Sequence, residues 1–277
     1  MALQSLLTKI GCRSPSLEQL GHKYKCDKVT VHHYEDRYEQ HLRPIRKDLR
    51  NILEIGVGGG NAPNSGGESL WMWQDYFPHA RLYGLDIYDK HHLDNNRIHT
   101  FIIDQSNTDS LSEFARKHGP FDLIIDDGSH RGVDITAALR VLYPYLKDDC
   151  YYVIEDIQTS YWGDFGGSSI AYNVPETATN LLKHLIDIIH SGEMTCEDTP
   201  AKQTGWAVSE LHVYHNIAFI KKTATVAPSR VLNQEYAAHQ RMMDEKNNRG
   251  LEVANQHWGQ DAVFRHDVLS KSCQNGG

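Results

Sequence analysis

Five short apolar segments alternate with amphipathic segments along this sequence, and that alternation limits its fold more than any other feature. The apolar segments span 51–56, 81–87, 97–104, 121–125 and 150–154, and the amphipathic ones span 68–77, 110–118, 133–146 and 176–190. Strands that helices cover on both faces are apolar throughout, and each return to a parallel neighbour needs a crossover. The pattern therefore predicts an α/β fold of Rossmann-like type, with a doubly wound, mostly parallel sheet.

The region after the last of these helices adds a different kind of strand pair. Two apolar runs within 208–221 meet at His215-Asn216, which predicts a C-terminal hairpin whose strands are antiparallel and bring the sheet to seven strands. We expect three regions: an N-terminal helical cap at 1–50, a ligand-binding domain at 51–222 and a polar C-terminal extension at 223–277. In the extension, 234–245 is helix-like and the tail from 270 is expected to be disordered.

Charge and cysteine content exclude several classes of protein. Lys and Arg number 28 against 36 Asp and Glu, a net charge of −8, which argues against nucleic acid as a partner. The five cysteines are scattered without a C-x-x-C pair, so neither a disulfide framework nor a zinc knuckle is indicated. No apolar run approaches the ~18 residues of a membrane span, and the start is too polar for a signal segment. We expect a cytoplasmic protein that binds no membrane.

A glycine-rich loop follows the first strand. The run Val57-Gly-Gly-Gly60 allows a sharp turn and a close approach to a ligand. Asn61-Ala62-Pro63 follows where a P-loop needs Gly-Lys-Ser/Thr, and Asn61 stands where a dinucleotide fingerprint needs its third glycine. Asp86, at the end of the second strand, suits the ribose hydroxyls of either a dinucleotide or S-adenosylmethionine. The glycines alone leave both ligands open.

Acidic residues follow the fourth and fifth strands directly. Asp126, Asp127 and His130 come after the first of these, and Glu155 and Asp156 after the second. The carboxyl ends of parallel strands open on a shared crevice, and neighbouring strands lie ~4.8 Å apart, so these groups are expected to meet. Strand-end acids can instead cap the helices that follow. Four acids and a histidine at two adjacent ends favour a metal site with a base beside it.

The residue types point to the metal and to the base. An all-oxygen set of Asp127, Glu155 and Asp156 favours magnesium over zinc or copper. His130 lies three residues beyond Asp127 and can accept a proton near neutral pH. Asp126 alternates to the other side of the strand end, where it is expected to support its neighbours or to cap a helix.

The glycine loop resembles motif I of the class I S-adenosylmethionine-dependent methyltransferases, because an acid, Glu54, precedes Gly56-Val-Gly58. Further motifs resemble, in the same order over about residues 30–170, the metal-dependent sugar O-methyltransferases of macrolide and related natural-product pathways, the mycinamicin type. These motifs are the segments 66–78, 84–87, 104–106, 125–130 and 154–161.

The resemblance implies roles for individual residues. It implies His130 as catalytic base and Mg²⁺ ligands at Asp127, Glu155 and Asp156. It also implies S-adenosylmethionine contacts at Glu54, Gly56, Gly58, Ser69, Asp86, Ile103 and Asp104. Acceptor contacts are expected at Gln158, Tyr161 and Trp162. The rings of Tyr161 and Trp162 can stack on a sugar or belong to the core. A homo-oligomer is implied as well.

The function expected from these features is Mg²⁺-dependent transfer of a methyl group to a hydroxyl of a sugar or glycosylated natural product. A metal lowers the pKa of a hydroxyl that it binds, which a neutral sugar needs before it can attack a sulfonium. Three alternatives remain: methyl transfer to a catechol-like diol, a non-catalytic S-adenosylmethionine-binding scaffold, and a nicotinamide oxidoreductase. The long connection at 162–175 is expected to be a lid or binding loop.

Overall fold

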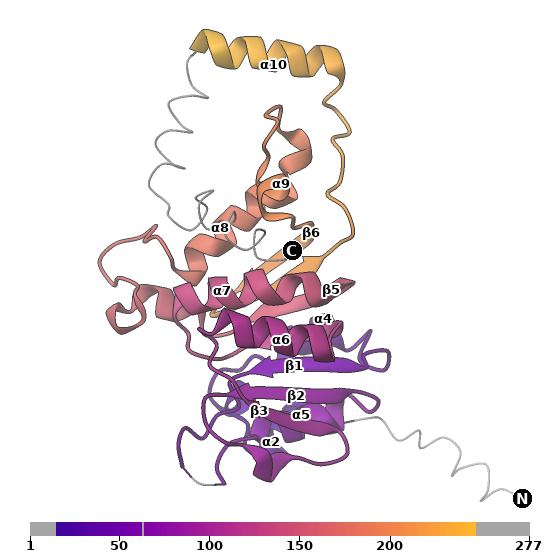
Figure 1. Ribbon diagram of the computed structural model, residues 1–277, viewed down its shortest axis with the longest axis vertical. Helices are drawn as coiled ribbons and strands as arrows, with labels where there is room; N and C mark the ends of the chain where they lie inside the picture. The colour runs from indigo at the N-terminus through magenta and orange to yellow at the C-terminus, as the bar shows by residue number, and fades with distance from the viewer. Residues whose placement is uncertain (1–14, 63, 248–277) are drawn as a thin grey trace, which may run out of the picture. The chain divides into compact units, whose positions relative to one another are not determined.

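The computed structural model describes residues 15–62 and 64–247 and divides into two compact units, one up to Ile102 and one from Ile103 on (Figure 1). The start of the predicted cap and the tail from 270 lie outside the described residues. The boundaries predicted at 50 and 222 stay predictions.

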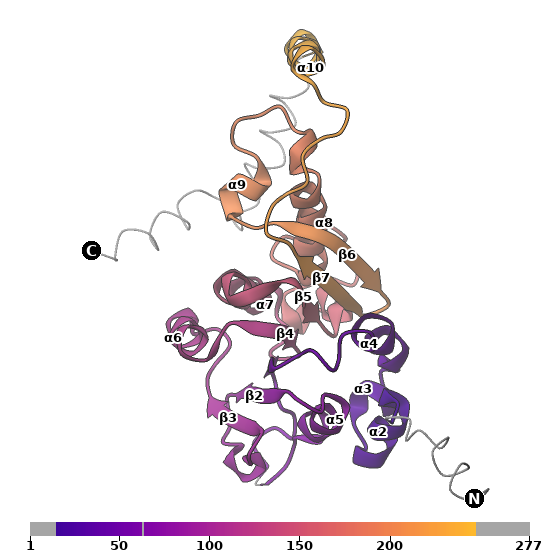
Figure 2. The same cartoon turned by 90° about the vertical axis from the view of Figure 1, so that its right-hand side faces the viewer.

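The first unit combines three parallel strands with a group of helices (Figure 2). The strands are β1 (Asn51–Ile55), β2 (Arg81–Asp86) and β3 (Ile98–Ile102), with β2 between the other two. The helices are α2 (Leu17–Tyr24), α3 (Asp27–Thr30), α4 (Glu35–Leu42) and α5 (Glu68–Tyr76), with a 3-10 turn η1 (His91–Leu93). The first helices pack on one another and on α5, the helix that follows the glycine loop.

Aromatic side chains form the core between these helices. Trp73 of α5 is fully buried, and its ring centroid lies 5.0 Å from that of Tyr38 in α4 and 5.6 Å from that of Phe77. At the other end of the helix group, Ser16 and Gln19 close a capping box that fixes the start of α2. The predicted helix at 68–77 is confirmed to within one residue.

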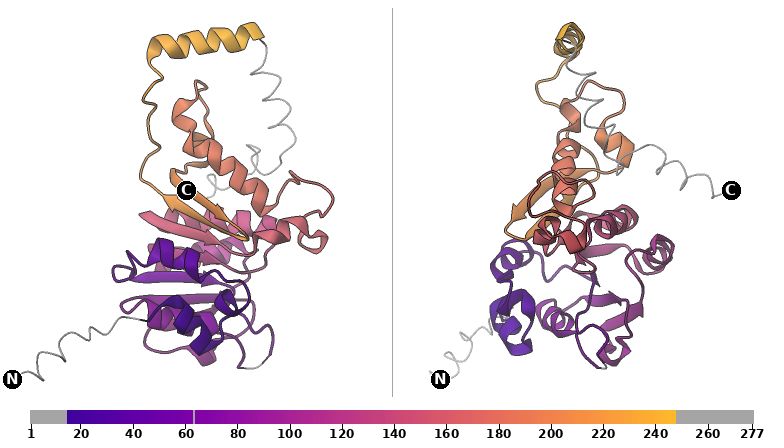
Figure 3. Two further views of the ribbon diagram at one scale, coloured as in Figure 1. Left: turned by 180° about the vertical axis from the view of Figure 1, so that it is seen from behind. Right: turned by 90° about the vertical axis from the view of Figure 1, so that its left-hand side faces the viewer.

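The second unit continues the strand and helix alternation (Figure 3). Its strands are β4 (Phe121–Asp126), β5 (Leu146–Ile154), β6 (Val208–Tyr214) and β7 (Ile217–Lys222). Its helices are α6 (Thr108–His118), α7 (Gly132–Leu142), α8 (Ala178–Ile189), α9 (Pro200–Thr204) and α10 (Gln234–Asn247). Short 3-10 turns lie at η2 (Tyr143–Tyr145), η3 (Ile157–Tyr161), η4 (Gly163–Phe165) and η5 (Ser191–Glu193).

One predicted helix ends earlier than expected. The segment 133–146 was predicted as a single helix, but α7 ends at Leu142 and gives way to η2, and β5 begins at Leu146 rather than at Cys150. Pro144 accounts for the difference, because it has no backbone N–H and its ring clashes with the preceding turn of an α-helix. The helical spacing of apolar residues continued to Leu146, although Pro144 prevents the helix from extending that far.

The strands form a single sheet in the order β3-β2-β1-β4-β5-β7-β6. β4 and β5 are parallel, whereas β7 is antiparallel to both β5 and β6. The predicted Rossmann-like fold, with seven strands and an antiparallel C-terminal hairpin, is confirmed. Within the described residues, no helix combines the length and the apolar character that a membrane crossing requires.

Candidate functional site

The glycine loop in the first unit is closed by hydrogen bonds at both of its sides. Gly67 N–H donates to the Val57 carbonyl at 2.8 Å, and the Lys90 ammonium donates to the carbonyls of Gly60 and Ser65 at 2.8 and 2.9 Å. Lys90 is only 2% exposed. The loop leaves β1 through Gly56 at φ 86°, a conformation that strongly favours glycine. Lys90 therefore restrains the loop by hydrogen bonds to two of its carbonyl groups.

Asp86 contacts the same loop, and its ribose-binding role stays a prediction. One of its carboxylate oxygens accepts the Val57 N–H at 3.0 Å and the other accepts the Tyr88 N–H at 2.9 Å. A carboxylate has about four acceptor positions, so hydroxyl groups of a ligand can still bind to it. Gly58, with φ 76°, lies in the adjacent turn.

Glu54 is buried in a hydrogen-bonded network rather than open to a ligand. It has no exposed surface, and its carboxylate accepts hydrogen bonds from Ser69 Oγ at 2.9 Å and Trp73 Nε1 at 3.2 Å. Lys28 Nζ lies 3.4 Å from the same carboxylate. This geometry fixes Ser69, which is itself 8% exposed. Direct cofactor contact by either residue stays a prediction.

Ile103 and Asp104 begin the second unit, directly after β3. Ile103 is half-buried and Asp104 is exposed. Hydrogen bonds from the Ser106 hydroxyl and N–H, at 2.7 and 2.8 Å, lower the pKa of Asp104 below its usual value. This carboxylate is therefore ionised at neutral pH and able to accept hydrogen bonds.

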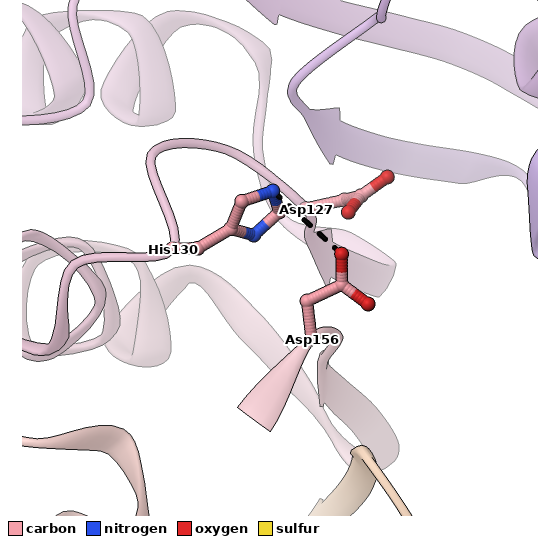
Figure 4. A group of neighbouring side chains, drawn as sticks. All are labelled: Asp127, His130 and Asp156. Atoms are coloured by element: carbon pink, nitrogen blue, oxygen red, sulfur yellow. Dashed lines mark ion pairs between the residues drawn. The ribbon is translucent and has the colours of Figure 1, made fainter. Parts of the chain in front are cut away.

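Two of the strand-end acids of the second unit, Asp127 and Asp156, lie together with His130 (Figure 4). Asp127, His130 and Asp156 each offer one ligand atom, and these atoms all lie within 4.8 Å of one another. We call these three residues the metal-site group. His130 Nε2 lies 3.8 Å from Asp156 Oδ2, longer than a hydrogen bond. The side chains of His130 and Asp156 are 24% and 15% exposed, so the group is open to a ligand.

Two residues of this group adopt a strained backbone. His130 has φ 57° and Asp156 has φ 52°, in the left-handed region that non-glycine residues seldom occupy. The Thr159 hydroxyl lies between their carbonyl oxygens, 2.9 Å from that of His130 and 2.8 Å from that of Asp156. Thr159 is 2% exposed. One buried hydroxyl thus links the two loops that carry the group.

Replacing Thr159 with valine should lower turnover by about tenfold, because a side chain of the same shape would no longer donate to either carbonyl. Serine at this position keeps the hydroxyl and should retain most of the activity. The measurement is the turnover number of both variants at saturating acceptor and Mg²⁺. Equal turnover for valine and serine would show that the hydroxyl has no role in the site.

Glu155 does not belong to the metal-site group, although the sequence predicted it as a ligand. Its side chain is 1% exposed, and its N–H donates to the Asp126 carbonyl at 3.0 Å, which extends the pairing of β4 with β5. The ligand role of Glu155 therefore stays a prediction.

Asp126 points into the protein, away from the group that its neighbour joins. It is 1% exposed and accepts hydrogen bonds from Tyr152 and Gln105. Burial raises the pKa of Asp126 to about 6, against the opposing effect of these hydrogen bonds. It does not cap a helix, and its contacts identify it as a supporting residue.

The predicted acceptor residues lie just beyond Asp156. Gln158 and Tyr161 line a cavity of about 350 Å³ between η3, α8 and the β6–β7 turn. Gln158 Oε1 is buried there without a hydrogen-bond partner among the described residues. Trp162 is 50% exposed outside this cavity, and its ring lies 5.9 Å from that of Phe165. Phe165 in turn lies 6.2 Å from the His130 ring.

Four residues of these networks escaped the sequence-based prediction: Lys90, Gln105, Tyr152 and Thr159. Gln105 and Thr159 lie inside motifs of the resemblance but had no role assigned, and each of the four contacts a residue at least 21 positions away. No local pattern reports such contacts.

Comparison with known proteins was made for both sequence and structure. No protein-family model matches the chain. It is 40% identical over 223 residues to mycinamicin VI 2''-O-methyltransferase of Micromonospora griseorubida, covering 79% of this chain and 55% of that protein. It is also 40% identical over 226 residues to 8-demethyl-8-alpha-L-rhamnosyl tetracenomycin-C 2'-O-methyltransferase of Streptomyces olivaceus, covering 80% and 59%.

A solved structure of a methyltransferase from the mycinamycin pathway is also similar to this chain. The MycE methyltransferase from the mycinamycin biosynthetic pathway, in complex with Mg, SAH and mycinamycin VI, superimposes with a TM-score of 0.71 at 39% identity. The match covers 80% of this chain and 58% of that one. The chain therefore spans between half and three fifths of the length of the relatives it matches.

Proposed function

We propose that this chain methylates a hydroxyl of a sugar or glycosylated natural product. The chain belongs to the class I S-adenosylmethionine-dependent methyltransferases and resembles their natural-product sugar O-methyltransferases. S-adenosylmethionine is the proposed donor and Mg²⁺ the proposed metal. The observation that carries the proposal is the metal-site group, in which two carboxylates and a histidine from adjacent strand ends meet.

Donor contacts in the first unit are assigned to the glycine loop and Asp86. Gly56 and Gly58 let the backbone come close to the ligand, and Asp86 offers a carboxylate to the ribose hydroxyls. Asp104, with Ile103 beside it, is assigned to the adenosine part. Glu54 is assigned a supporting role through Ser69, whose hydroxyl it fixes.

The two carboxylates of the metal-site group fit Mg²⁺. Asp127 and Asp156 supply the hard oxygen ligands that Mg²⁺ prefers, and Glu155 is proposed as a third ligand. When bound, Mg²⁺ supplies positive charge that makes an acceptor hydroxyl more acidic.

His130 is assigned as the base that removes the hydroxyl proton. Its Nε2 is too far from Asp156 Oδ2 for a hydrogen bond, so this nitrogen can accept a proton from an acceptor that lies beside the group. Asp156 then faces the imidazolium and stabilises its charge. The hydroxyl oxygen attacks the methyl carbon as the carbon–sulfur bond breaks.

Residues after Asp156 are assigned to the acceptor. Gln158 Oε1 lacks a partner among the described residues and can accept a hydrogen bond from an acceptor hydroxyl. Tyr161 and Trp162, which are 45% and 50% exposed, offer rings on which the apolar face of a sugar can stack. A cytoplasmic location and a homo-oligomeric state are part of the same proposal, with no nucleic acid or membrane as partner.

The experiment that tests this function measures S-adenosylhomocysteine release from S-adenosylmethionine with a panel of glycosides and catechols. Glycosides should be methylated, EDTA should abolish the release, and added Mg²⁺ should restore it, because the acceptor needs the metal. Preference for catechols would instead support the diol alternative. Binding of S-adenosylmethionine without turnover of any acceptor would support a scaffold, and full activity in EDTA would exclude the metal's role.

A further inference from the structure

We propose that Gln105 and Asp126 are positioning residues that set the loop carrying Asp127 and His130, and so tune the affinity of the metal-site group for a divalent cation. This inference rests on the proposed function, since it concerns the same metal. It gives a role to Asp126, the strand-end acid that does not join the group.

A short chain of hydrogen bonds connects Asp126 to the loop. The Gln105 amide donates from Nε2 to Asp126 Oδ1 at 2.7 Å, and its Oε1 accepts the Ser129 N–H at 2.8 Å. One carboxylate therefore holds the Ser129 backbone N–H of the loop through Gln105.

The other side of the carboxylate is fixed to the core. Tyr152 OH donates to Asp126 Oδ2 at 2.8 Å, and Tyr152 belongs to β5, the strand that leads to Asp156. Exposure is 1% for Asp126, 4% for Gln105 and 0% for Tyr152. Hydrogen bonds to a charged acceptor in such a dry environment are short and strong. The link is therefore stiff, and it joins both strand ends of the site.

The residue held by this link, Ser129, lies in the loop between Asp127 and His130. Gly128 and Ser129 separate these two members of the metal-site group, and His130 has the strained φ of 57°. A backbone in that region persists only when its surroundings fix it. Support at Ser129, directly before His130, therefore sets where the Asp127 carboxylate and the His130 ring point.

The test uses Mn²⁺ as a paramagnetic substitute for Mg²⁺ and measures its dissociation constant from the free Mn²⁺ signal in electron paramagnetic resonance. Gln105→Leu keeps the bulk of the side chain and removes both of its hydrogen bonds. It should weaken Mn²⁺ binding by about 10- to 100-fold, the usual cost of losing a group that supports a metal ligand. Gln203→Leu in α9 is the matched control, because the Gln203 amide hydrogen-bonds to Asp198, outside the metal-site group, and this variant should bind nearly as the wild type does.

A double variant separates positioning from general stability. Gln105→Glu with Asp126→Asn reverses the polarity of the link, since the new amide at 126 donates to the new carboxylate at 105, which still accepts the Ser129 N–H. It should bind Mn²⁺ more tightly than Gln105→Leu. Circular dichroism at the titration temperature establishes that each variant is folded. A loss of Mn²⁺ affinity in a folded variant then reports on positioning and not on a lower melting temperature.

Three results would overturn the proposal. Wild-type Mn²⁺ affinity in folded Gln105→Leu would show that the link does not position the loop, although the proposed function would stand. A folded double variant that binds no better than Gln105→Leu would show the same. Absence of Mn²⁺ binding by the wild type itself would remove the proposed metal site and this inference together.

Discussion

Replacing His130 with alanine should lower the turnover of methyl transfer by about 10² to 10⁴-fold, the usual contribution of a general base. The acceptor hydroxyl is a poor nucleophile while it keeps its proton, and alanine cannot accept that proton. The measurement is the rate of S-adenosylhomocysteine release at saturating acceptor, donor and Mg²⁺. His190→Ala, which changes an exposed histidine at the end of α8, is the matched control.

The position of His130 within 4.8 Å of both carboxylates makes a second measurement necessary. An imidazole this close to two carboxylates could bind the metal instead of accepting the proton of the acceptor hydroxyl. If His130 is the base, the alanine variant should keep its Mn²⁺ affinity and its S-adenosylhomocysteine affinity while turnover falls. A parallel loss of Mn²⁺ affinity would identify His130 as a ligand, and unchanged turnover would exclude it from the chemistry.

Replacing Asp127 with asparagine should reduce turnover by about 10³-fold, equivalent to roughly 4 kcal/mol of lost transition-state stabilisation. The amide keeps the size of the side chain but removes the negative charge that a divalent cation needs. Mn²⁺ affinity should fall in parallel, whereas affinity for S-adenosylhomocysteine should change little, because the glycine loop and Asp86 are intact. Isothermal titration calorimetry measures both.

Asp122→Asn is the matched control for that variant, because Asp122 is an aspartate at the opposite end of the same strand. It pairs with Lys147 at 2.7 Å and is not a member of the metal-site group, so its loss should not change the ligands of the metal. Mn²⁺ binding by Asp122→Asn should match the wild type. Retained Mn²⁺ binding by Asp127→Asn would contradict the assignment of Asp127 as a ligand.

Strand ends were the most predictable part of the site. Asp127 and Asp156 were placed together because each follows a mostly apolar strand with one acid between, and parallel strands bring such ends to one edge. The structure pairs Asp126 with Ile154 across β4 and β5 and confirms this reasoning. The grouping of His130 with the two acids followed from its place three residues beyond Asp127.

Side-chain direction was much less predictable. Glu155 and Asp156 are adjacent in sequence, yet Asp156 joins the metal-site group, whereas Glu155 is buried and is not one of its three members. Asp156 has φ 52°, so the strand does not simply continue through it, and the alternation of side chains that holds along a strand stops at that point. Such a turn depends on Thr159 and its contacts, which the apolar pattern does not report.

By itself, the sequence determined the fold class, the glycine loop and the strand ends at which the acids lie. It could do so because burial imposes a regular spacing of apolar residues on each strand and helix. That spacing involves only neighbouring residues in the sequence. Only the tertiary structure decided which acid faces the site and which supports it, and that Gln105, Tyr152, Thr159 and Lys90 hold the loops in place. Those contacts join residues 21 to 30 positions apart, and packing creates them without leaving a local pattern.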